Sequence, residues 1–298
     1  MPFANTALSL RKRGITMLEF QNVSYVYGEG TPFKKTALDN VSFTIPEGKV
    51  TGLIGHTGSG KSTLSLLMNG LIAPTSGKVL LNGQDINAKG INKRDVRFKV
   101  GLVFQYPEYQ LFEETVEKDI AYGPRNMGLS EEDIKERILY AAHFTGIDDD
   151  MLKKSPFELS GGQKRRVAIA GVIAMDPEIL VLDEPAAGLD PKGKSEILGA
   201  LCDFRKKRDN TLVIISHSME DIGMYSDNII TMAEGKVLLS GSPKEVFSHH
   251  DTLISNGLAI PEVTEILSIL RKDGYDVDDG VFTVEDAAEE LRKLVLKK

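Results

Sequence analysis

Hydrophobic and polar residues alternate in the first part of the chain and form continuous apolar runs further on. The alternation covers Leu18–Tyr27 and Ala37–Ile45, and the segment between them, Gly28–Lys35, contains glycine and proline. Alternation with a period of two is typical of half-buried strands, so these ranges predict two strands joined by a loop. Gly77–Leu81 and Val100–Phe104 predict two further short strands.

Apolar runs without polar residues occur at Ile179–Leu182 and Leu212–Ile215. Such runs are typical of strands that are buried on both faces of a parallel sheet. Between them, Pro191–Arg208 predicts a helix with Asp190 as its N-cap. Two more strands are predicted at Ile229–Met232 and Lys236–Leu239. Strands that alternate with helices indicate an α/β domain.

Helical patterns interrupt this domain and also follow it. The block from Pro107 to about Ser155 resembles a helical insertion. It predicts helices at Glu113–Gly123 and Ser130–Thr145, with breaks between them at Pro124 and Gly128. A polar loop is predicted at Asp148–Lys154. Other helices are predicted at Gln163–Ala174, Pro243–Ser248, Pro261–Asp273 and Val284–Leu296. We therefore expect a flexible N-terminal extension (1–17), an α/β domain (18–245) with a helical subdomain at about 107–165, and a helical extension (246–298) that is a candidate for dimerisation.

Charge and composition exclude several classes of protein. A net charge of −7 and a pI near 5.4 argue against a broad nucleic-acid surface, so nucleic acid is not an expected partner. The single cysteine, Cys202, excludes an intrachain disulfide framework and suits a reducing compartment. No stretch approaches 18 consecutive apolar residues, so we expect no membrane-spanning helix.

The segment Lys49–Leu67 (KVTGLIGHTGSGKSTLSLL) carries the most specific chemical signal. An apolar strand leads into a glycine-rich turn with the pattern G-x-x-x-x-G-K-[ST] and then into a helix-forming run. The glycines let backbone N–H groups point at phosphate oxygens, and the helix adds the positive end of its dipole. Lys61 is placed to reach the β- and γ-phosphates and Ser62 to ligate Mg²⁺. The predicted nucleotide-binding residues are Gly55, His56, Thr57, Gly58, Ser59, Gly60, Lys61, Ser62 and Thr63.

Two carboxylates, Asp183 and Glu184, follow the apolar run Ile179–Leu182 in the sequence ILVLDEP. At the carboxyl end of a strand beside a phosphate loop, Asp183 is placed to hold Mg²⁺ through its water. Glu184 is placed to polarise a water molecule for in-line attack on the γ-phosphorus. The alternative is a surface acidic pair, which is the commoner interpretation of Asp-Glu outside such a context.

A second anion-binding turn, LSGGQ (Leu159–Gln163), opens a predicted helix and lacks the lysine of the first turn. With Gln105 and His217, the motifs occur in an order that resembles the nucleotide-binding domain of ABC transporters, over about residues 18–245. The resemblance implies a P-loop NTPase fold of the ABC type, α/β with an antiparallel β subdomain and a helical insertion, here followed by a C-terminal helical extension. It also implies an ATPase that uses ATP and Mg²⁺.

The resemblance further implies roles for single residues. Gln105 matches the family's glutamine that contacts Mg²⁺ and the lytic water, and His217 matches the histidine that contacts the γ-phosphate. Tyr27 matches the aromatic residue that stacks on adenine, and Asp190 lies in the loop that communicates across the dimer. By themselves, Gln105 and His217 would be read as ordinary polar residues at strand ends, and Tyr27 as an edge tyrosine that packs on the sheet.

In this family two domains face each other head to tail, which accounts for the LSGGQ motif. The resemblance implies that Ser160, Gly161, Gly162 and Gln163 of one domain close over ATP that is bound to Lys61 of the other. It therefore implies a second ABC ATPase subunit as partner, either a paralogue or a second copy of this chain.

Three stretches resemble the ATP-binding subunits of energy-coupling factor transporters, which import vitamins and some metal ions. These are Phe104–Phe112 (FQYPEYQLF), the tail Asn256–Asp276 and Gly30–Lys35 (GTPFKK), the last being similar to the second member of their paired ATPases. The resemblance implies a transmembrane coupling subunit, a substrate-binding membrane subunit and a peripheral location at the cytoplasmic face of the cell membrane. For the tail, the alternative is a generic helical cap on the core.

Tyr106–Phe112 is the predicted docking surface for the membrane partner. Its aromatic residues, together with Glu108 as a surface charge, suit a groove that receives a partner helix bearing a basic residue. The alternative is that the aromatics only pack the helical insertion.

Three other functions stand as alternatives: the ATPase of another importer or exporter, a soluble ABC protein of translation or DNA repair, and an inactive regulatory partner. Soluble members usually carry two such domains or a long coiled-coil insertion, and this chain has neither. Intact Lys61, Glu184 and His217 argue against an inactive partner. The sequence does not identify the transported substrate, because its binding residues would lie in another polypeptide.

Overall fold

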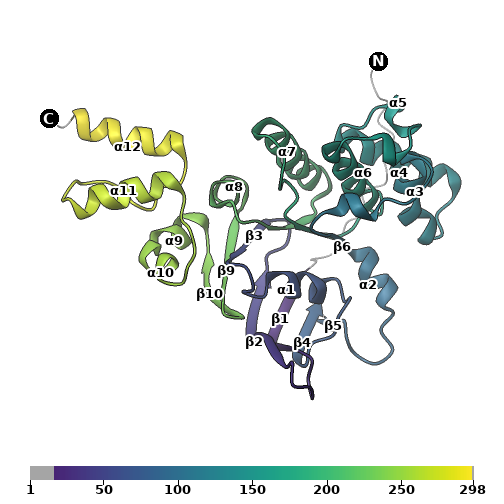
Figure 1. Cartoon of the computed structure of the whole chain (residues 1–298), viewed down its shortest axis with the longest axis horizontal. Helices are drawn as coiled ribbons and strands as arrows, with labels where there is room; N and C mark the ends of the chain where they lie inside the picture. Colours follow the sequence, from purple (N-terminus) through teal and green to yellow (C-terminus); the bar gives the residue numbers. More distant parts are fainter. Residues whose placement is uncertain (1–16, 297–298) are drawn as a thin grey trace.

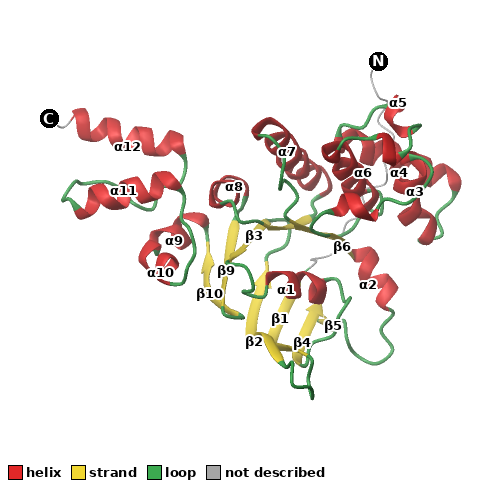
Figure 2. Ribbon diagram, viewed as in Figure 1, coloured by secondary structure: helices red, strands yellow, loops and turns green. Residues whose placement is uncertain are grey.

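Two β-sheets form the centre of the molecule in the computed structural model, which describes residues 17–296. The larger sheet contains β3 (Val50–Gly55), β6 (Val100–Val103), β7 (Ile179–Asp183), β8 (Thr211–Ile215), β9 (Asn228–Ala233) and β10 (Lys236–Gly241). Their order is β10–β9–β3–β8–β7–β6, in which β10 is antiparallel to β9 and the other neighbours are parallel. Figure 2 shows the strands at the centre of the molecule with helices around them. The smaller, antiparallel sheet contains β1 (Leu18–Tyr27), β2 (Lys35–Ile45), β4 (Ser76–Leu81) and β5 (Gln84–Asp85), in the order β2–β1–β4–β5.

The apolar runs of the sequence become strands that are buried on both faces. Every residue of β7 and β8 is buried. Because successive side chains of a strand point to opposite faces, Leu180 and Leu182 enter one hydrophobic cluster, whereas Ile179 and Val181 enter another. The predicted α/β architecture with an antiparallel subdomain is confirmed.

The larger sheet separates two layers. Helix α1 (Lys61–Met68) lies between the two sheets, and its Leu64 and Leu67 are buried in the same cluster as Phe20 of β1 (Figure 1). The opposite face of the larger sheet is covered by helices, whose apolar residues form the other cluster. These are α3 (Val116–Asn126), α4 (Glu131–Thr145), α5 (Asp149–Leu152), α6 (Gly161–Ile173), α7 (Pro191–Arg208) and α8 (Met219–Tyr225).

Three shorter elements connect these layers. Helix α2 (Lys93–Lys99) precedes β6, the 3-10 turn η1 (Pro107–Gln110) follows β6, and the 3-10 turn η2 (Pro156–Glu158) precedes α6. Figure 1 shows α3, α4, α5 and α6 gathered at one end of the molecule as a helical block.

Two predicted boundaries in this block are wrong. Pro124 does not end a helix, because α3 continues to Asn126 with Pro124 buried near its C-terminal end, and the helix lacks only the one backbone hydrogen bond that a proline cannot donate. The predicted loop Asp148–Lys154 contains α5, because the Asp148 side chain accepts a hydrogen bond from the Met151 N–H at 2.7 Å and the turn buries Met151 and Leu152.

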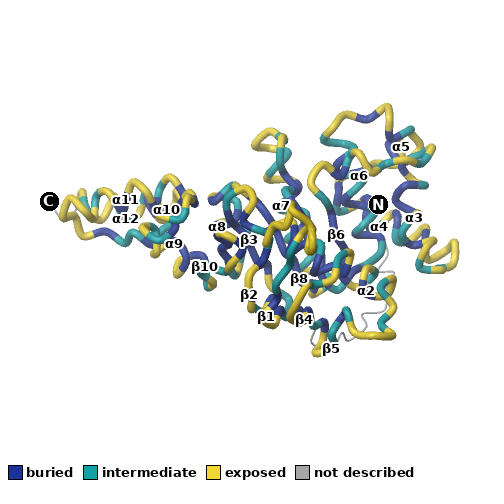
Figure 3. The backbone as a smooth tube through the Cα atoms, turned by 60° about the horizontal axis from the view of Figure 1, so that its bottom comes forward, coloured by how far each residue is buried: buried dark blue, intermediate teal, exposed yellow. Residues whose placement is uncertain are grey.

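The C-terminal part is helical and projects from the side of the sheet opposite the helical block (Figure 1). It contains α9 (Pro243–Ser248), α10 (His250–Ser255), α11 (Glu262–Lys272) and α12 (Val284–Leu296). Helices α11 and α12 have a small cluster of their own around Leu267, Val277 and Ala287. Figure 3 shows that these helices are more exposed than the central strands. Helices α2, α8 and α10 were not predicted from the sequence.

The predicted N-terminal extension falls almost entirely outside the described residues, since 1–16 are not among them. Met17, the last residue of that range, exchanges two hydrogen bonds with Asn82, at 2.9 Å each. Between residues 17 and 296, no helix combines the length and the apolar character that crossing a membrane requires.

Candidate nucleotide site

The phosphate loop and the predicted catalytic residues follow four neighbouring strands of the larger sheet. The phosphate loop follows β3, His217 follows β8, Glu184 follows β7 directly after Asp183, and Gln105 follows β6. The carboxyl ends of parallel strands lie at one edge of a sheet, where ligands of α/β proteins usually bind. The sheet order β3–β8–β7–β6 therefore brings together residues that are far apart in the sequence.

The phosphate loop has a backbone that depends on glycine. Gly60 has φ 107°, and a Cβ atom at this position would lie 2.7 Å from the carbonyl oxygen of Ala37. Lys61 folds back over the loop, where its Nζ donates to the carbonyl oxygens of Gly55 at 2.6 Å and His56 at 3.1 Å. Burial lowers the pKa of Lys61. The loop thus holds one buried cationic group above its backbone.

The remaining residues of the loop have different environments. Ser59 and Thr63 are buried, whereas Thr57, Gly58 and Ser62 are exposed and His56 is half-buried. No heavy atom lies within 4 Å of a Cβ built on Gly58, so the space beside it is open. The exposed edge of the loop is therefore accessible to a nucleotide.

Tyr27 lies at the end of β1, next to the start of α1. Its hydroxyl is 3.3 Å from Oγ1 of Thr63, and its ring packs edge-on against Tyr25 with 4.8 Å between ring centroids. The side chain is 42% exposed. This position beside the phosphate loop leaves part of the aromatic ring available for stacking, as the adenine prediction requires.

Two of the three predicted Mg²⁺ ligands are in contact at the edge of the sheet, and the third follows the neighbouring strand. The Ser62 hydroxyl donates to the Asp183 carboxylate, whose pKa is raised mainly by burial. Gln105 is exposed at the end of β6, next to the strand that carries Asp183. Residues 17–296 contain no metal-binding group of three or more His, Cys, Asp or Glu side chains. One carboxylate with a hydroxyl and an amide fits Mg²⁺, which takes few protein ligands and completes its shell with phosphates and water.

Glu184 has a strained backbone and a perturbed carboxyl group. Its φ is 52°, in the left-handed region that non-glycine residues rarely adopt, and its N–H donates to the Ile215 carbonyl oxygen at 2.9 Å. Its Oε1 lies 3.5 Å from Nε2 of His217. Burial, followed by the neighbouring Asp183 carboxylate, raises the pKa of Glu184 to about 7. A carboxylate with a pKa near 7 is able to accept a proton from water at neutral pH.

This pKa predicts an unusual pH dependence of stability. Because folding raises the pKa of Glu184 above its ordinary value of 4.5, the folded chain binds this proton more tightly than the unfolded chain. The stabilisation is fully present below pH 4.5 and is lost as the pH rises through about 7. Glu184→Gln, which cannot ionise, should therefore raise the Tm at pH 8 by roughly 5 °C, equivalent to about 2 kcal/mol, and should give no such gain at pH 4.5.

The measurement is differential scanning calorimetry of the nucleotide-free chain at several pH values. Glu29→Gln, at an exposed loop position, is the control and should have the wild-type Tm throughout. An equal gain for Glu184→Gln at every pH would mean that packing, and not the charge, is responsible.

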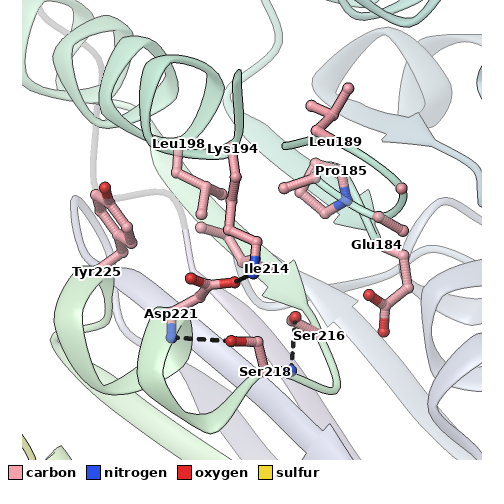
Figure 4. A pocket seen from close by; sticks show the side chains of 13 residues that line it. Glu184, Pro185, Leu189, Lys194, Leu198, Ile214, Ser216, Ser218, Asp221 and Tyr225 are labelled. Atoms are coloured by element: carbon pink, nitrogen blue, oxygen red, sulfur yellow. Dashed lines mark hydrogen bonds and ion pairs between the residues drawn. The ribbon is translucent and has the colours of Figure 1, made fainter. Parts of the chain in front are cut away.

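A pocket of about 180 Å³ lies next to Glu184, between the loop 185–189 and helices α7 and α8 (Figure 4). The Nζ of Lys194 in α7 lies 3.0 Å from a carboxylate oxygen of Asp221 in α8 across this pocket. Sequence reasoning did not assign either residue. The available signal was that Asp221 falls in the first turn of the helix that follows His217. The ion pair connects the segment after Glu184 with the segment after His217.

The LSGGQ motif is not brought to the phosphate loop of the same chain. Ser160 caps α6, and its backbone N–H donates to the Gln163 side chain at 2.9 Å, which completes a capping box. Helix α6 packs in the cluster on one face of the larger sheet, whereas α1 packs on the other face. Figure 1 shows α1 and α6 in separate layers, and Gly161 is exposed. Asp190 caps α7 by accepting the Gly193 N–H at 2.9 Å, as predicted.

The aromatic segment after Gln105 is exposed, but its acidic residue is not free. Tyr106, Tyr109 and Phe112 are 51%, 85% and 57% exposed. The carboxylate of Glu108, however, lies 3.1 Å from Nη2 of Arg165, and the two side chains are only 17% and 5% exposed. The prediction that Glu108 is a surface charge available to a partner is wrong, because a basic residue of the same chain already occupies it.

Comparison with known proteins agrees with these features. A family model described as ABC transporter matches residues 38–187. The chain is 51% identical over 282 residues to the energy-coupling factor transporter ATP-binding protein EcfA2 of Clostridium tetani, which covers 94% of this chain and 98% of that protein. It is 52% identical over 279 residues to the EcfA2 protein of Clostridium acetobutylicum, with coverage of 93% and 98%.

Solved structures have the same fold. The structure of cbiO1 from Clostridium perfringens, described as part of the ABC transporter complex cbiONQ, has a TM-score of 0.73 and 38% identity, covering 86% of this chain and all (100%) of that one. A dimeric ATP-binding cassette in a post-hydrolysis state, bound to ADP and Pi, has a TM-score of 0.67 and 27% identity, covering 76% of this chain and 98% of that one.

A phosphate loop, a carboxylate pair after a buried strand and an LSGGQ helix on this α/β fold define the ABC class of ATPases, which hydrolyse ATP. Within that class, the chain belongs to the family of energy-coupling factor transporter ATP-binding proteins.

Proposed function

We propose that this chain is one of two ATPase subunits of an energy-coupling factor importer that takes up vitamins or other micronutrients. The observation that carries the proposal is the separation of its two anion-binding turns, which lie in layers on opposite faces of the sheet. Each chain therefore has two half-sites, and a site with both turns requires a second ABC ATPase subunit, either a paralogue or another copy.

In this proposal the nucleotide is ATP and the metal is Mg²⁺. The metal, when bound, neutralises charge on the phosphates. Asp183, Ser62 and Gln105 would hold it, Lys61 would contact the β- and γ-phosphates, and Tyr27 would stack on the adenine. Glu184 and His217 lie 3.5 Å apart at the end of the sheet. Glu184 takes the proton of the attacking water, while His217 and Gln105 orient the γ-phosphate and that water.

The partner across the nucleotide contributes LSGGQ. In this arrangement Ser160, Gly161, Gly162 and Gln163 of one subunit close over the ATP held by Lys61 of the other. Ser160 and Gly161 are exposed at the start of α6, as such a contact requires. Closing and reopening of the two subunits then follow ATP binding and hydrolysis. The C-terminal helices α11 and α12 are a second candidate contact between the subunits.

The membrane partners are proposed to be a transmembrane coupling subunit and a substrate-binding subunit, with this chain at the cytoplasmic face of the membrane. Tyr106, Tyr109 and Phe112 are the proposed docking surface for the coupling subunit. Their exposure supports it, because large aromatic side chains in a cluster are typical of interaction sites. Phe112 also packs edge-on against Tyr122, with 4.9 Å between ring centroids.

The test of this proposal is assembly with the membrane subunit. We expect Tyr109→Ala with Phe112→Ala to reduce co-purification with the transmembrane coupling subunit by about tenfold or more, because hot-spot aromatics contribute about 2 kcal/mol each. ATP affinity of the free chain should not change, since neither residue lies at the phosphate loop. The measurement is quantitative pull-down from membranes that contain the assembled transporter.

Phe33→Ala is the matched control, because Phe33 is 87% exposed and lies in the loop between β1 and β2, outside the aromatic segment. It should co-purify with the membrane subunit as the wild type does. Wild-type recovery of the double variant would mean that the docking surface is elsewhere. Recovery of an exporter subunit, instead of a coupling subunit, would contradict the proposed transporter class.

A further inference from the structure

Arg165 connects three segments that are far apart in the sequence. It lies in α6, in the turn that follows LSGGQ, and its side chain is 5% exposed. Its Nε and Nη2 donate to the carboxylate of Glu108 in η1 at 3.3 and 3.1 Å. Its Nη1 donates to the backbone carbonyl oxygen of Ala187, in the loop that follows Glu184. One guanidinium group thus joins the aromatic segment, the LSGGQ helix and the loop 185–189.

The aromatic segment is also held at its other end. The carboxylate of Asp119 in α3 accepts the backbone N–H groups of Phe112 at 3.3 Å and Glu113 at 3.2 Å. Asp119 is 9% exposed. The segment that carries the exposed tyrosines is therefore attached to the helical block at two buried points. It cannot move away from that block without separating a buried ion pair, which is unfavourable because each charge would lose its partner in a region of low polarity.

The loop 185–189 has a second contact with the LSGGQ helix. A Cβ atom built on Gly162 would lie 3.3 Å from Cδ2 of Leu189, so the motif and this loop already approach each other closely. The loop starts at Glu184, whose backbone N–H is bonded to β8. Helix α6 is thus in contact with the segment that follows Glu184.

We propose that Arg165 is a positioning residue, which makes the aromatic segment, the LSGGQ motif and the loop 185–189 move as one body. The inference rests on the proposed function, because it takes the membrane subunit as the partner that displaces the aromatic segment. Docking or displacement at Tyr106–Phe112 then changes the position of Ser160 and of the loop beside Glu184 without a rearrangement of the sheet.

An arginine suits this role for a geometric reason. Its planar guanidinium group contacts the carboxylate of Glu108 through two nitrogens and still has a third nitrogen for the Ala187 carbonyl. A lysine would supply one ammonium group on a flexible chain and would not fix the three segments in one orientation. We therefore expect Arg165→Lys to lose the connection among the three segments, although the positive charge is kept.

The experiment uses the assembled transporter with MgATP as the probe. The quantity is the coupling ratio, which is the ATP hydrolysis rate of the complex with the membrane subunit divided by the rate of the ATPase subunits without it. We expect Arg165→Met to lower this ratio by about tenfold, within the range of coupling constants between separate sites. ATP affinity of the free chain, measured by calorimetry, should stay at the wild-type value, because Lys61 lies in the other layer.

Arg208→Met is the matched control for the loss of a buried ion pair. Arg208 Nε donates to Asp176 at 3.0 Å, and the two side chains are 11% and 16% exposed. Asp176 lies before the amino end of β7, at the edge of the sheet away from the site. This variant should lower the Tm, although less than Arg165→Met does because Nη1 of Arg137 still lies 4.0 Å from Asp176, and it should keep the wild-type coupling ratio.

A second variant separates positioning from stability. Glu108→Met combined with Arg165→Met removes both charges, so the Tm should recover relative to Arg165→Met alone. The coupling ratio should stay low, because the connection is still missing. If the ratio recovers together with the Tm, or if Arg208→Met lowers it equally, Arg165 has a structural role and the inference is wrong.

The same experiment separates this inference from the proposed function. The proposed function is wrong if the wild-type chain does not assemble with the membrane subunit, or if the subunit does not change its hydrolysis rate. The inference about coupling is then wrong as well. If the membrane subunit changes the hydrolysis rates of the wild-type chain and of Arg165→Met by the same factor, only the role of Arg165 is contradicted, and the proposed function stands.

Discussion

Glu184→Gln is expected to lower ATP turnover by at least about 10²-fold and to leave ATP binding intact. Glu184 is buried at the end of β7, and its carboxyl group has a pKa of about 7, so it is a base matched to neutral pH. Glutamine has nearly the same shape but cannot accept the proton of the attacking water. The measurements are steady-state hydrolysis by the assembled complex and calorimetric ATP affinity of the free chain.

The matched control is Glu220→Gln, which removes an exposed carboxylate from the first turn of α8, near the site but away from the sheet edge. It should keep turnover close to the wild type. Near-normal turnover of Glu184→Gln in the assembled complex would reject Glu184 as the base. Loss of ATP affinity in the same variant would instead indicate that it helps to bind the nucleotide.

Lys61→Ala is expected to weaken ATP binding by about 10- to 100-fold, because a hydrogen bond from a charged donor contributes about 1.5–3 kcal/mol. The Nζ of Lys61 already lies above the phosphate loop, within 2.6 Å of the Gly55 carbonyl oxygen. The variant removes the ammonium group and keeps the backbone N–H groups of the loop. Isothermal titration calorimetry of the free chain with MgATP measures the change.

Lys49→Ala is the control for this variant. Lys49 is exposed just before β3, at the end of the strand opposite the phosphate loop, so its loss should not change the affinity. The folded state should also tolerate Lys61→Ala, because burial of the ammonium group is unfavourable, as its lowered pKa indicates. An unchanged affinity of the Lys61→Ala variant would place the nucleotide elsewhere.

Local patterns in the sequence were sufficient to identify the strands and the phosphate loop. Alternation predicted the half-buried strands β1 and β2, and uninterrupted apolar runs predicted β7 and β8, because burial on one or two faces directly selects residue type. The cap at Asp190 was also predictable, since a helix N-terminus needs a nearby side-chain acceptor. Short helices such as α5, by contrast, are stabilised mainly by their tertiary contacts, which a periodic pattern does not contain.

The phosphate-binding motif, the carboxylate pair and LSGGQ follow from the sequence alone, because each depends on neighbouring residues in one turn. Their arrangement depends on the tertiary structure. Strand β8 lies between β3 and β7, and this order brings His217 within 3.5 Å of Glu184. The pairing of Glu108 with Arg165, which are separated by 57 positions, likewise requires η1 and α6 to pack together. No local pattern records which distant charge a carboxylate will meet, so only the folded chain decided that Glu108 is an internal partner and not a free surface charge.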